Sequence, residues 1–316
     1  MSEQNENIWP PRHPRFRSHP APIKRVAAND LIARALPPRA MILEPVLSSK
    51  SLALVYGPRG IGKTFLGLGI AWAAASGESF LKWRAPQPRR VLYVDGEMAV
   101  GDIQQRLAHL GAAPPMLEFM LADLNRGPLP DLSQEEGQNQ FEESWDGARP
   151  DLLVLDNLAS LVGIRNDDVD SWTGLQRWLL KLRRLGMAVL MIHHANKQGR
   201  PRGTSRREDL LDIVIGLRRP GDWQPEQGAR FELHFEKARG LHGEAAEPIE
   251  ARVETDEAGV LRWCWQPAHI SDLHRVAALL KDGLNPNQIA RELGIPRATT
   301  YRMRKRAMEM GLIERR

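Results

Sequence analysis

One glycine-rich octapeptide constrains the fold of this 316-residue chain more than any other feature. It reads Gly57-Pro58-Arg59-Gly60-Ile61-Gly62-Lys63-Thr64 and fits the pattern G-x-x-x-x-G-K-[ST]. An apolar stretch typical of a buried strand (51–56) precedes it, and a stretch with a helical pattern (63–75) follows it. The glycines let backbone N–H groups point inward as an anion nest, and the helix N-terminus adds a favourable dipole. The motif therefore predicts a phosphate-binding loop between a strand and a helix.

Each residue of this loop has an expected role. We expect Lys63 to reach the β- and γ-phosphates of a nucleotide and the Thr64 hydroxyl to bind Mg²⁺. The loop from Gly57 to Thr64, with Phe65 next to it, is the expected nucleotide-binding segment, with ATP and Mg²⁺ as its ligands. The alternative is a glycine-rich turn in which Lys-Thr occurs by chance, and the flanking strand and helix argue against it.

Acidic residues end two other expected strands. Asp156 follows the apolar run 152–155, while Asp95 and Glu97 follow the run 90–94. The carboxyl ends of parallel strands gather at one edge of a sheet, beside the phosphate-binding loop. We expect Asp156 to bind Mg²⁺ or its water, and Glu97 to be the acid/base group for an attacking water. The alternatives are a helix cap for Asp156 and ordinary loop carboxylates for the other two.

A histidine pair, His193 and His194, ends the apolar strand 188–192. One of the two is expected to hydrogen-bond the γ-phosphate and to sense its loss, and the alternative is a structural pair. No cysteine or third histidine stands nearby at the spacing of a zinc site, and Cys264 is the one cysteine of the chain.

The order of the expected elements predicts an α/β fold. Alternating strands and helices with double-faced apolar strands indicate a mainly parallel sheet with helices on both faces. Later strands are expected to extend the same sheet with antiparallel edges. The expected strands are 51–56, 90–94, 117–121, 152–155, 188–192, 211–217, 230–235, 249–253 and 260–265, and the helices between them are 63–75, 102–110, 134–145 and 170–185.

Composition and charge divide the chain into three parts. With 42% hydrophobic and 26% charged residues it is an ordinary globular sequence, which excludes disordered and collagen-like chains. The absence of a membrane-length apolar run and of a signal-like N-terminus leads us to expect a soluble, cytoplasmic protein with no membrane partner. We expect a disordered, proline- and arginine-rich arm (1–28), an ATPase-like domain (29–268) and a small helical domain (271–316). Asp30 is expected to cap a short helix through Leu36.

Basic residues concentrate at the ends of the chain and in one loop. Residues 271–316 hold ten Lys and Arg against five Asp and Glu, and residues 1–41 hold seven against three. A further basic loop spans 197–207. These segments suggest a polyanionic partner. Binding of single-stranded DNA in a central channel would be one explanation for the basic loop. The alternative for the arm and the loop is a solvated surface.

The C-terminal stretch NPNQIARELGIPRATTYRMRKRAMEMGLI resembles a helix-turn-helix. Helices are expected over 271–281, 286–293 and 297–310, and Leu312-Ile313 is expected to begin a wing. Asn285 is expected to cap the second of these helices, with Pro286 at its first position. In such folds the third helix enters the major groove. The residues expected to face DNA are Arg297, Thr299, Thr300 and Arg302, and those expected to contact phosphates are Arg304, Lys305 and Arg306. The alternative is a three-helix module that docks to protein.

The ordered set of motifs resembles the RecA-like ATPases, in a mainly parallel α/β sheet. The segments LYVDGEM, LLVLDNLASL, MIHHANK and RGTSRREDLLD together resemble the RepA group of plasmid-type replicative helicases over about residues 45–265. The resemblance implies ATP hydrolysis with Mg²⁺ and a hexameric ring acting on single-stranded DNA. It implies Lys63 and Thr64 as phosphate and metal ligands, Asp156 as the Walker B aspartate, Glu97 as the catalytic acid/base, and His193 or His194 as the sensor.

A basic turn after strand 230–235 carries one further implication of this resemblance. The segment Glu236-Lys237-Ala238-Arg239-Gly240 is similar to the turn by which ring helicases place cations in a neighbouring subunit. Lys237 and Arg239 would then stabilise charge on the γ-phosphate in trans. The alternative is an ordinary basic turn. Two functions remain open: a DNA motor, and an ATP-switched DNA-binding regulator without unwinding activity.

Overall fold

The computed structural model describes residues 23–145, 147–163, 169–196, 209–256 and 259–314. The chain divides after Pro38 into two units, which are described separately. The described part of the first unit holds one short helix, α1 (Ala28–Ile32). Asp30 lies inside its first turn and not at its cap, and the helix ends well before Leu36, so both details of the expected helix were wrong. The greater part of the expected arm, 1–22, lies outside the described residues.

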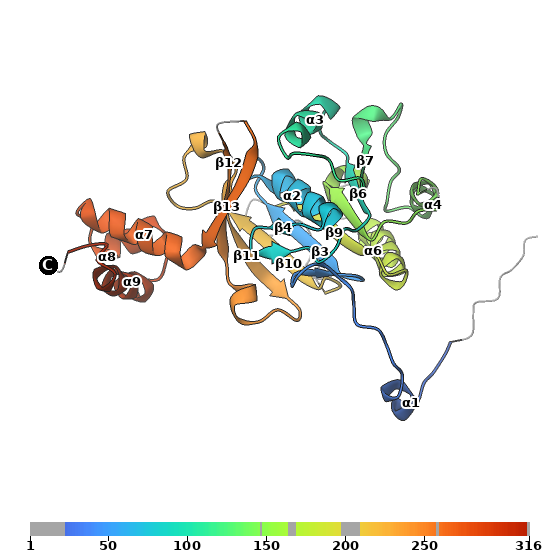
Figure 1. Cartoon of the computed structure of the whole chain (residues 1–316), viewed down its shortest axis with the longest axis horizontal. Coiled ribbons are helices and arrows are strands. Elements are labelled where there is room, and N and C mark those ends of the chain that lie inside the picture. Colours follow the sequence, from blue (N-terminus) through green and yellow to red (C-terminus); the bar gives the residue numbers. More distant parts are fainter. Residues whose placement is uncertain (1–22, 146, 164–168, 197–208, 257–258, 315–316) are drawn as a thin grey trace, which may run out of the picture. The chain divides into compact units, whose positions relative to one another are not determined.

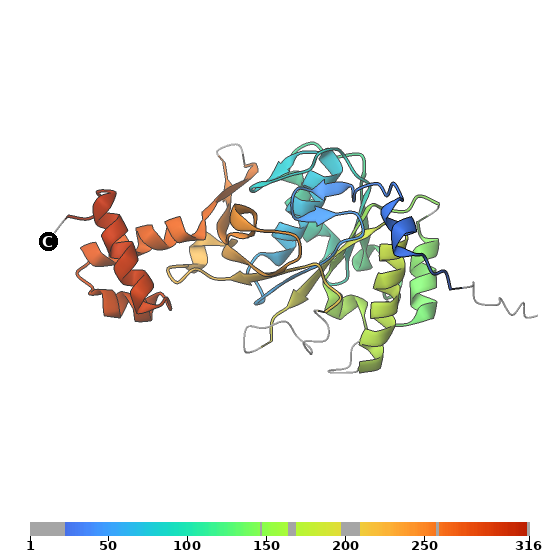
Figure 2. The same ribbon diagram turned by 90° about the horizontal axis from the view of Figure 1, so that it is seen from below.

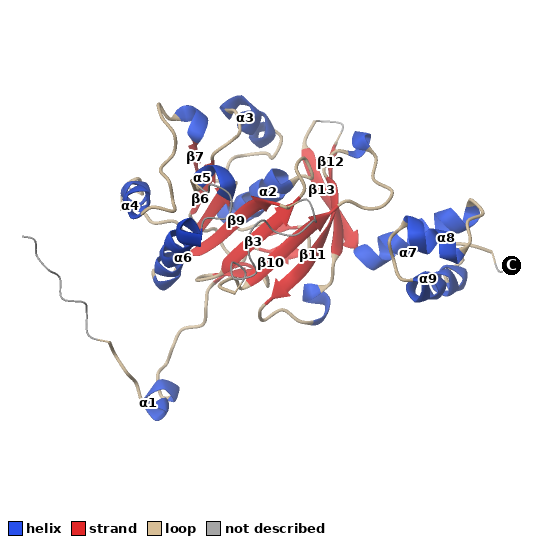
Figure 3. Cartoon of the chain, turned by 180° about the vertical axis from the view of Figure 1, so that it is seen from behind, coloured by secondary structure: helices blue, strands red, loops and turns tan. Residues whose placement is uncertain are grey.

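The second unit is built on a mixed sheet that has nine strands in the part of the chain that is described (Figures 1 and 3). The strand order is β13-β12-β11-β10-β3-β9-β8-β6-β7. The six strands from β10 to β7 are parallel, and β11, β12 and β13 extend the sheet in antiparallel pairs, as predicted. The bounds are β3 (Leu52–Gly57), β6 (Val91–Asp95), β7 (Leu117–Leu121), β8 (Leu152–Asp156), β9 (Ala188–His194), β10 (Ile213–Arg218), β11 (Arg230–Ala238), β12 (Ile249–Thr255) and β13 (Leu261–Pro267).

Helices cover both faces of this sheet and create two apolar cores. Successive side chains of a strand point to opposite faces, so each central strand contributes to both cores. One core packs against α2, and the other packs against α6. A Cβ atom on Gly67 would lie 2.5 Å from Ile192, so glycine is needed where α2 lies against β9. The helices are α2 (Lys63–Ser76), α3 (Val100–Ala108), α4 (Glu135–Glu143), α5 (Leu158–Leu161) and α6 (Val169–Arg184).

Short elements complete the sheet unit. Among the residues that the structure describes, two small antiparallel hairpins accompany the main sheet, and three 3₁₀ turns join its strands. They are β1 (Met41–Leu43), β2 (Leu47–Ser48), β4 (Ser79–Phe80), β5 (Trp83–Arg84), η1 (Ala122–Leu124), η3 (Pro225–Gln227) and η4 (Gly243–Ala246).

Three helices follow β13 and lie beyond that end of the sheet (Figure 2). They are α7 (Ala268–Lys281), α8 (Pro286–Glu292) and α9 (Arg297–Glu309). The predicted cap of α8 is confirmed, because the Asn285 side chain accepts from the backbone N–H of Asn287 and Gln288. The expected wing was wrong: no strand follows α9 in the residues described up to Glu314, and Leu312 and Ile313 pack against the small apolar core of the three helices.

Buried ion pairs attach α7 to the sheet. Arg275 pairs with Glu250 of β12, and with Glu232 of β11 at 2.7 Å. Arg230 donates to the other Glu250 oxygen at 2.9 Å. Removing one partner of such a buried pair would leave an uncompensated charge, so these contacts fix α7 against the sheet. In the described residues, none of the helices is both long and apolar enough to span a membrane.

Candidate functional site

The phosphate-binding loop joins the end of β3 to the start of α2, as predicted. Gly60 and Gly62 have φ angles of 70° and 112°, in the left-handed region that glycine adopts without steric cost. Lys63 is 6% exposed, and its ammonium donates hydrogen bonds to the carbonyl oxygens of Gly57 (3.1 Å) and Pro58 (2.8 Å). The loop and its lysine therefore form one anion site at the N-terminus of α2.

The alternation of side chains along the strands decides which polar groups reach this loop. Even-numbered residues of β8 and β9 pack on the α2 side of the sheet. Asp156 and His194 therefore lie on the same side as the phosphate-binding loop. His193 points to the opposite face, where it is buried, while His194 lines a cavity beside the loop. Of the two histidines, the structure brings only His194 to this site.

Asp156 is buried at the end of β8. The Tyr93 hydroxyl donates to Asp156 Oδ2 at 2.7 Å, and the Thr64 hydroxyl forms a second hydrogen bond with the same carboxylate. Burial nevertheless raises the pKa of Asp156 to about 6, since it outweighs both hydrogen bonds and the Lys63 charge. Asn157, and not Asp156, caps the next helix by accepting the backbone N–H of Ala159.

The chemistry of these donors fits a magnesium ion. Thr64 and Asp156 supply a hydroxyl and a carboxylate oxygen, which are the hard ligands that Mg²⁺ prefers. A buried carboxylate with a raised pKa is one whose negative charge is incompletely compensated by the protein. These two residues would therefore hold the ion together with nucleotide phosphates.

Asp95 and Glu97 differ in position and in task. Asp95 is 2% exposed, and its Oδ1 accepts the backbone N–H groups of Glu97 (2.9 Å) and Met98 (2.6 Å). The Glu97 side chain is 52% exposed and lines the cavity. Asp95 thus shapes the turn that presents Glu97, whose carboxylate a water molecule in the cavity can reach.

His194 stands between Glu97 and Asn157. Its Nε2 atom lies 3.9 Å from Glu97 Oε2 and 3.2 Å from Asn157 Nδ2. The contact connects the ends of β9 and β8 to the turn after β6.

One cavity of about 380 Å³ brings Lys63 and Thr64 of the phosphate-binding loop together with the acidic residues and His194 at the strand ends. Its residues are Gly60, Gly62, Lys63, Thr64, Phe65, Asp95, Glu97, Met98, Arg106, Asp156, Asn157, His194, Gly228 and Ala229. Sequence reasoning missed Arg106, whose guanidinium carbon lies 4.5 Å from the centre of the Phe65 ring. Nothing local marks Arg106, because this contact depends on how α3 packs beside α2.

The basic turn after β11 lies elsewhere. Since β11 is antiparallel to β10 and β10 is parallel to β3, the end of β11 lies at the start of β3. Lys237 and Arg239 therefore lie at the amino-terminal end of the parallel strands, and Lys63 of the same chain lies at their carboxyl end. Lys237 Nζ donates to the Asp209 carbonyl oxygen and Arg239 Nη1 pairs with Asp212 Oδ1, each at 3.3 Å. The basic loop 197–207 lies outside the described residues.

The expected DNA-facing residues of α9 lie in different surroundings. Arg297, Arg302, Lys305 and Arg306 are exposed and Thr299 is partly buried. Thr300 was a wrong expectation: it is fully buried, and its hydroxyl donates to the Pro296 carbonyl oxygen at 3.3 Å. Packing of α9 on α7 and α8 places this residue inside the three-helix core, where it cannot reach a base.

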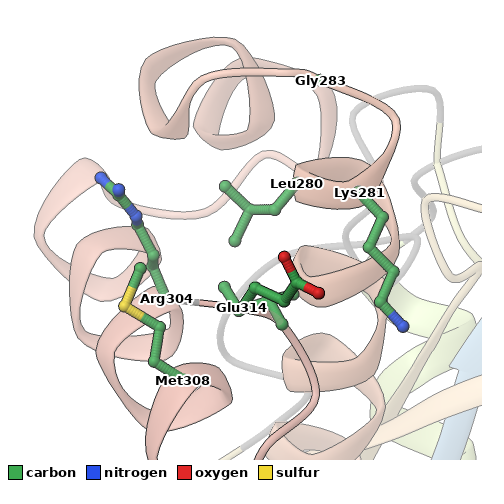
Figure 4. A pocket seen from close by; sticks show the side chains of 7 residues that line it. Leu280, Lys281, Gly283, Arg304, Met308 and Glu314 are labelled. Atoms are coloured by element: carbon green, nitrogen blue, oxygen red, sulfur yellow. The ribbon is translucent and has the colours of Figure 1, made fainter. Parts of the chain in front are cut away.

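Two hollows flank α9. Arg302 and Arg306 line a cavity of about 620 Å³ whose other wall includes Glu232 and Asp272. On the opposite flank, Arg304 lines a hollow of about 330 Å³ with Leu280, Lys281 and Met308 (Figure 4).

The face of α9 that lies between the two hollows carries two exposed side chains. They are Lys305, whose side chain is 81% exposed, and Tyr301, which is 49% exposed. Sequence reasoning had missed Tyr301.

Comparison with known families assigns the sheet unit. Residues 17–200, more than half of the chain, match the family model described as AAA domain. The chain belongs to the AAA-domain family. The family match and the order of the strands in the sheet identify this unit as a RecA-like P-loop ATPase domain, and the cavity described above lies at its phosphate-binding loop. A second model, described as homeodomain-like domain, matches residues 272–314 and so coincides with α7, α8 and α9.

Distant relatives of this AAA-domain chain are DNA repair proteins. The DNA repair protein RadA of Brucella abortus (strain 2308) is 27% identical over 219 residues, which are 66% of this chain and 38% of the relative. RadA of Campylobacter jejuni is 27% identical over 180 residues, 55% of this chain and 35% of the relative. RadA of Mycobacterium tuberculosis (strain H37Rv) is 24% identical over 170 residues, 52% and 31% of the two chains. The matches thus span between 31% and 38% of these relatives, and they support a RecA-like ATPase without singling out the RepA group.

Proposed function

We propose that this chain is an ATP-hydrolysing RecA-like motor that acts on DNA, assembled as a ring similar to the hexamers of replicative helicases. The observation that carries the proposal is the convergence of Lys63, Thr64, Glu97, Asp156 and His194 on one cavity, from four separate parts of the chain. The DNA repair relatives and the homeodomain-like region support DNA as the partner.

The residues of the cavity divide the work of hydrolysis. Lys63 neutralises charge on the β- and γ-phosphates, and Thr64 and Asp156 hold Mg²⁺ beside them. The bound ion supplies charge neutralisation at the phosphate oxygens. Glu97 accepts a proton from the attacking water, and Asp95 fixes the turn that carries Glu97. His194 contacts Glu97, and this contact lets it report the loss of the γ-phosphate to β9.

Two further groups complete the proposed site. Phe65 and Arg106 form a flat aromatic and cationic surface at the cavity, on which a purine base can stack. Lys237 and Arg239 lie at the opposite end of the strands from their own cavity. We propose that they act as cations in the cavity of a neighbouring copy. This arrangement makes hydrolysis depend on assembly.

Two pKa shifts give nucleotide binding a defined pH window. Burial raises the pKa of Asp156 to about 6 and lowers the pKa of Lys63 to about 8. Below pH 6, Asp156 is protonated and loses its charge for Mg²⁺, and above pH 8, Lys63 loses its charge for phosphate. We expect the affinity for Mg·ATP to be highest between these values, as measured by calorimetric titration. Without Mg²⁺ the contribution of Asp156 to the fall in affinity at low pH should disappear, while the fall above pH 8 should remain. A profile in Mg·ATP that does not change with pH would contradict the assignment.

The exposed face of α9 predicts how the protein meets duplex DNA. Lys305→Ala should weaken binding uniformly across sequences and reduce the salt dependence by about one phosphate contact, a change of ~0.9 in the slope of log K against log salt. Tyr301→Ala should weaken binding with little change in that slope. Lys50→Ala, which removes an exposed lysine of the sheet unit, is the control with the same charge change. An unaltered slope in Lys305→Ala would remove α9 from the DNA interface.

A mass measurement with a non-hydrolysable ATP analogue and a single-stranded oligonucleotide tests the motor directly. We expect a ring in the presence of both ligands, and ATP turnover that the oligonucleotide stimulates. A protein that stays monomeric at all concentrations, with turnover indifferent to oligonucleotides, would overturn the motor. The homeodomain-like region favours one alternative, an ATP-switched DNA-binding regulator without unwinding activity. The regulator predicts nucleotide-dependent binding to one duplex site in a gel-shift assay, and no strand separation.

A further inference from the structure

One loop, residues 219–229 between β10 and β11, contacts both the phosphate-binding loop and the C-terminal helices. It is eleven residues long and includes the 3₁₀ turn η3, which Gln224 and Gln227 cap reciprocally. Two of its residues, Gly228 and Ala229, line the nucleotide cavity. We call it the bridging loop. Its two ends adjoin β10 and β11, which are neighbours in the sheet.

The first side of the bridging loop holds the phosphate-binding loop. Arg219 Nη2 donates to the Gly60 carbonyl oxygen at 2.9 Å, and Arg219 Nη1 donates to the Gly228 carbonyl oxygen at 3.3 Å. The Arg219 guanidinium also stacks on the Trp223 ring, 3.4 Å from its centre, and Trp223 Nε1 donates to the same Gly228 oxygen at 3.2 Å. One cation therefore ties the phosphate-binding loop to both ends of the bridging loop.

A second contact on this side involves no charge. A Cβ atom on Gly62 would lie only 3.0 Å from Ala229 Cβ, so the two backbones are packed closely there. If Gly60 or Gly62 shifts when a phosphate binds, the bridging loop must shift with it, because the two loops are in close contact.

The other side of the bridging loop holds the C-terminal helices. Asp222 pairs with Arg275 Nε of α7 at 3.0 Å, and with Arg230 Nη2 at 3.1 Å. Arg275 is 8% exposed and is the residue that the buried ion pairs fix against β11 and β12. At the neighbouring position, a Cβ atom on Gly221 would lie 3.4 Å from the Leu293 side chain at the end of α8.

We propose that the bridging loop couples nucleotide occupancy to the seating of α7 and α8. Arg219 is its positioning residue toward the phosphate-binding loop, and Asp222 is its positioning residue toward α7. Nucleotide bound by the phosphate-binding loop fixes Gly60, Gly60 fixes Arg219, and the ordered loop holds Asp222 against Arg275. This coupling rests on the proposed function, because it presupposes that the cavity binds nucleotide. Linkage makes it reciprocal: whatever factor nucleotide adds to DNA binding by the C-terminal helices, DNA adds to nucleotide binding.

Amide hydrogen exchange of the full chain, with and without Mg²⁺ and a non-hydrolysable ATP analogue, tests the coupling without knowing the DNA sequence. At saturating analogue, exchange should slow in α2, in the bridging loop, and in α7 and α8, by about fivefold or more in the last two, the lower limit of typical couplings between sites. Arg219→Ala and Asp222→Asn should abolish the slowing in α7 and α8 while the slowing in α2 persists. Arg218→Ala is the matched control, because this adjacent arginine is 60% exposed and pairs with Glu236 instead.

The outcomes separate the coupling from the proposed function. Slowing in α2 with no change in α7 and α8 of the unmodified protein would overturn the coupling alone. The same holds if both variants keep the slowing that the unmodified protein shows. No slowing in α2 would overturn nucleotide binding and, with it, the coupling. The Asp222 side chain is 44% exposed, so Asp222→Asn is expected to fold. Arg219→Ala independently tests the contact with the phosphate-binding loop.

Discussion

Replacement of Glu97 by glutamine should leave nucleotide binding intact and reduce ATP turnover by about 10²- to 10⁴-fold, the range for loss of a general acid/base group. Glutamine keeps the size of the side chain but cannot accept the proton of an attacking water. The half-exposed position of Glu97 in the cavity means that the amide is tolerated without a packing penalty. Binding of a fluorescent ATP analogue and steady-state phosphate release measure the two effects separately.

The matched control for this substitution is Glu118→Gln, on the exposed part of β7. It makes the same chemical change away from the cavity and should alter neither quantity. Asp95→Asn should lower turnover through the turn it shapes, because its Oδ1 accepts the backbone N–H groups of Glu97 and Met98. Full turnover in Glu97→Gln would move the proton acceptor to another residue, with Asp95 the next candidate.

Replacement of Lys63 by alanine should weaken nucleotide binding by roughly 30- to 4,000-fold, which corresponds to the ~2–5 kcal/mol lost when one partner of a buried charge pair is removed. Lys63 is 6% exposed and stands at the end of the phosphate-binding loop. Solvent water therefore compensates poorly for the positive charge that the phosphates lose in the variant. Calorimetric titration with Mg·ATP measures the loss directly.

The free protein should respond differently to the same substitution. Burial lowers the pKa of Lys63 to about 8, below its unfolded value, so at pH 7 the folded state bears a cost for keeping this lysine charged. Alanine removes that cost, and the thermal midpoint of the nucleotide-free protein at pH 7 should not fall. Lys82→Ala is the control: burial also lowers the pKa of Lys82, which donates to the carbonyl oxygens of Glu244 and Glu247, away from the cavity. It should leave nucleotide affinity unchanged, and a loss of affinity equal to that of Lys63→Ala would count against a specific role for Lys63.

Local patterns were sufficient for the framework of this protein. Gly60 and Gly62 have positive φ angles, which glycine adopts without steric cost, and Lys63 supplies a charge at the N-terminus of α2. The loop could therefore be placed from eight residues. The central strands were recognisable because they are buried on both faces and therefore continuously apolar. The acids at the ends of β6 and β8 followed, because parallel strands bring their carboxyl ends to one edge.

The same continuous burial concealed other features. A strand that is apolar on both faces gives no sign of which face is which, so the sequence left His193 and His194 equivalent. The prediction of a wing was wrong for a related reason. Leu312 and Ile313 are apolar, as strand residues are, but they pack against the core of the three helices instead. Thr300 reads as a surface residue of a basic helix, and only the packing of three helices buries it.

What the sequence by itself determined, then, is the chemistry at each strand end: one phosphate-binding loop, the acids beside it and a basic helical region at the C-terminus. The tertiary structure alone decided which side chains meet across the chain. It brings His194 and not His193 to the cavity, and it places Arg106 over Phe65. It places Lys237 and Arg239 away from their own cavity. The bridging loop contacts both Gly60 and Arg275. The physical reason is that strand and loop patterns report interactions among near neighbours, whereas these contacts join residues far apart in sequence and exist only once the sheet has closed its two cores.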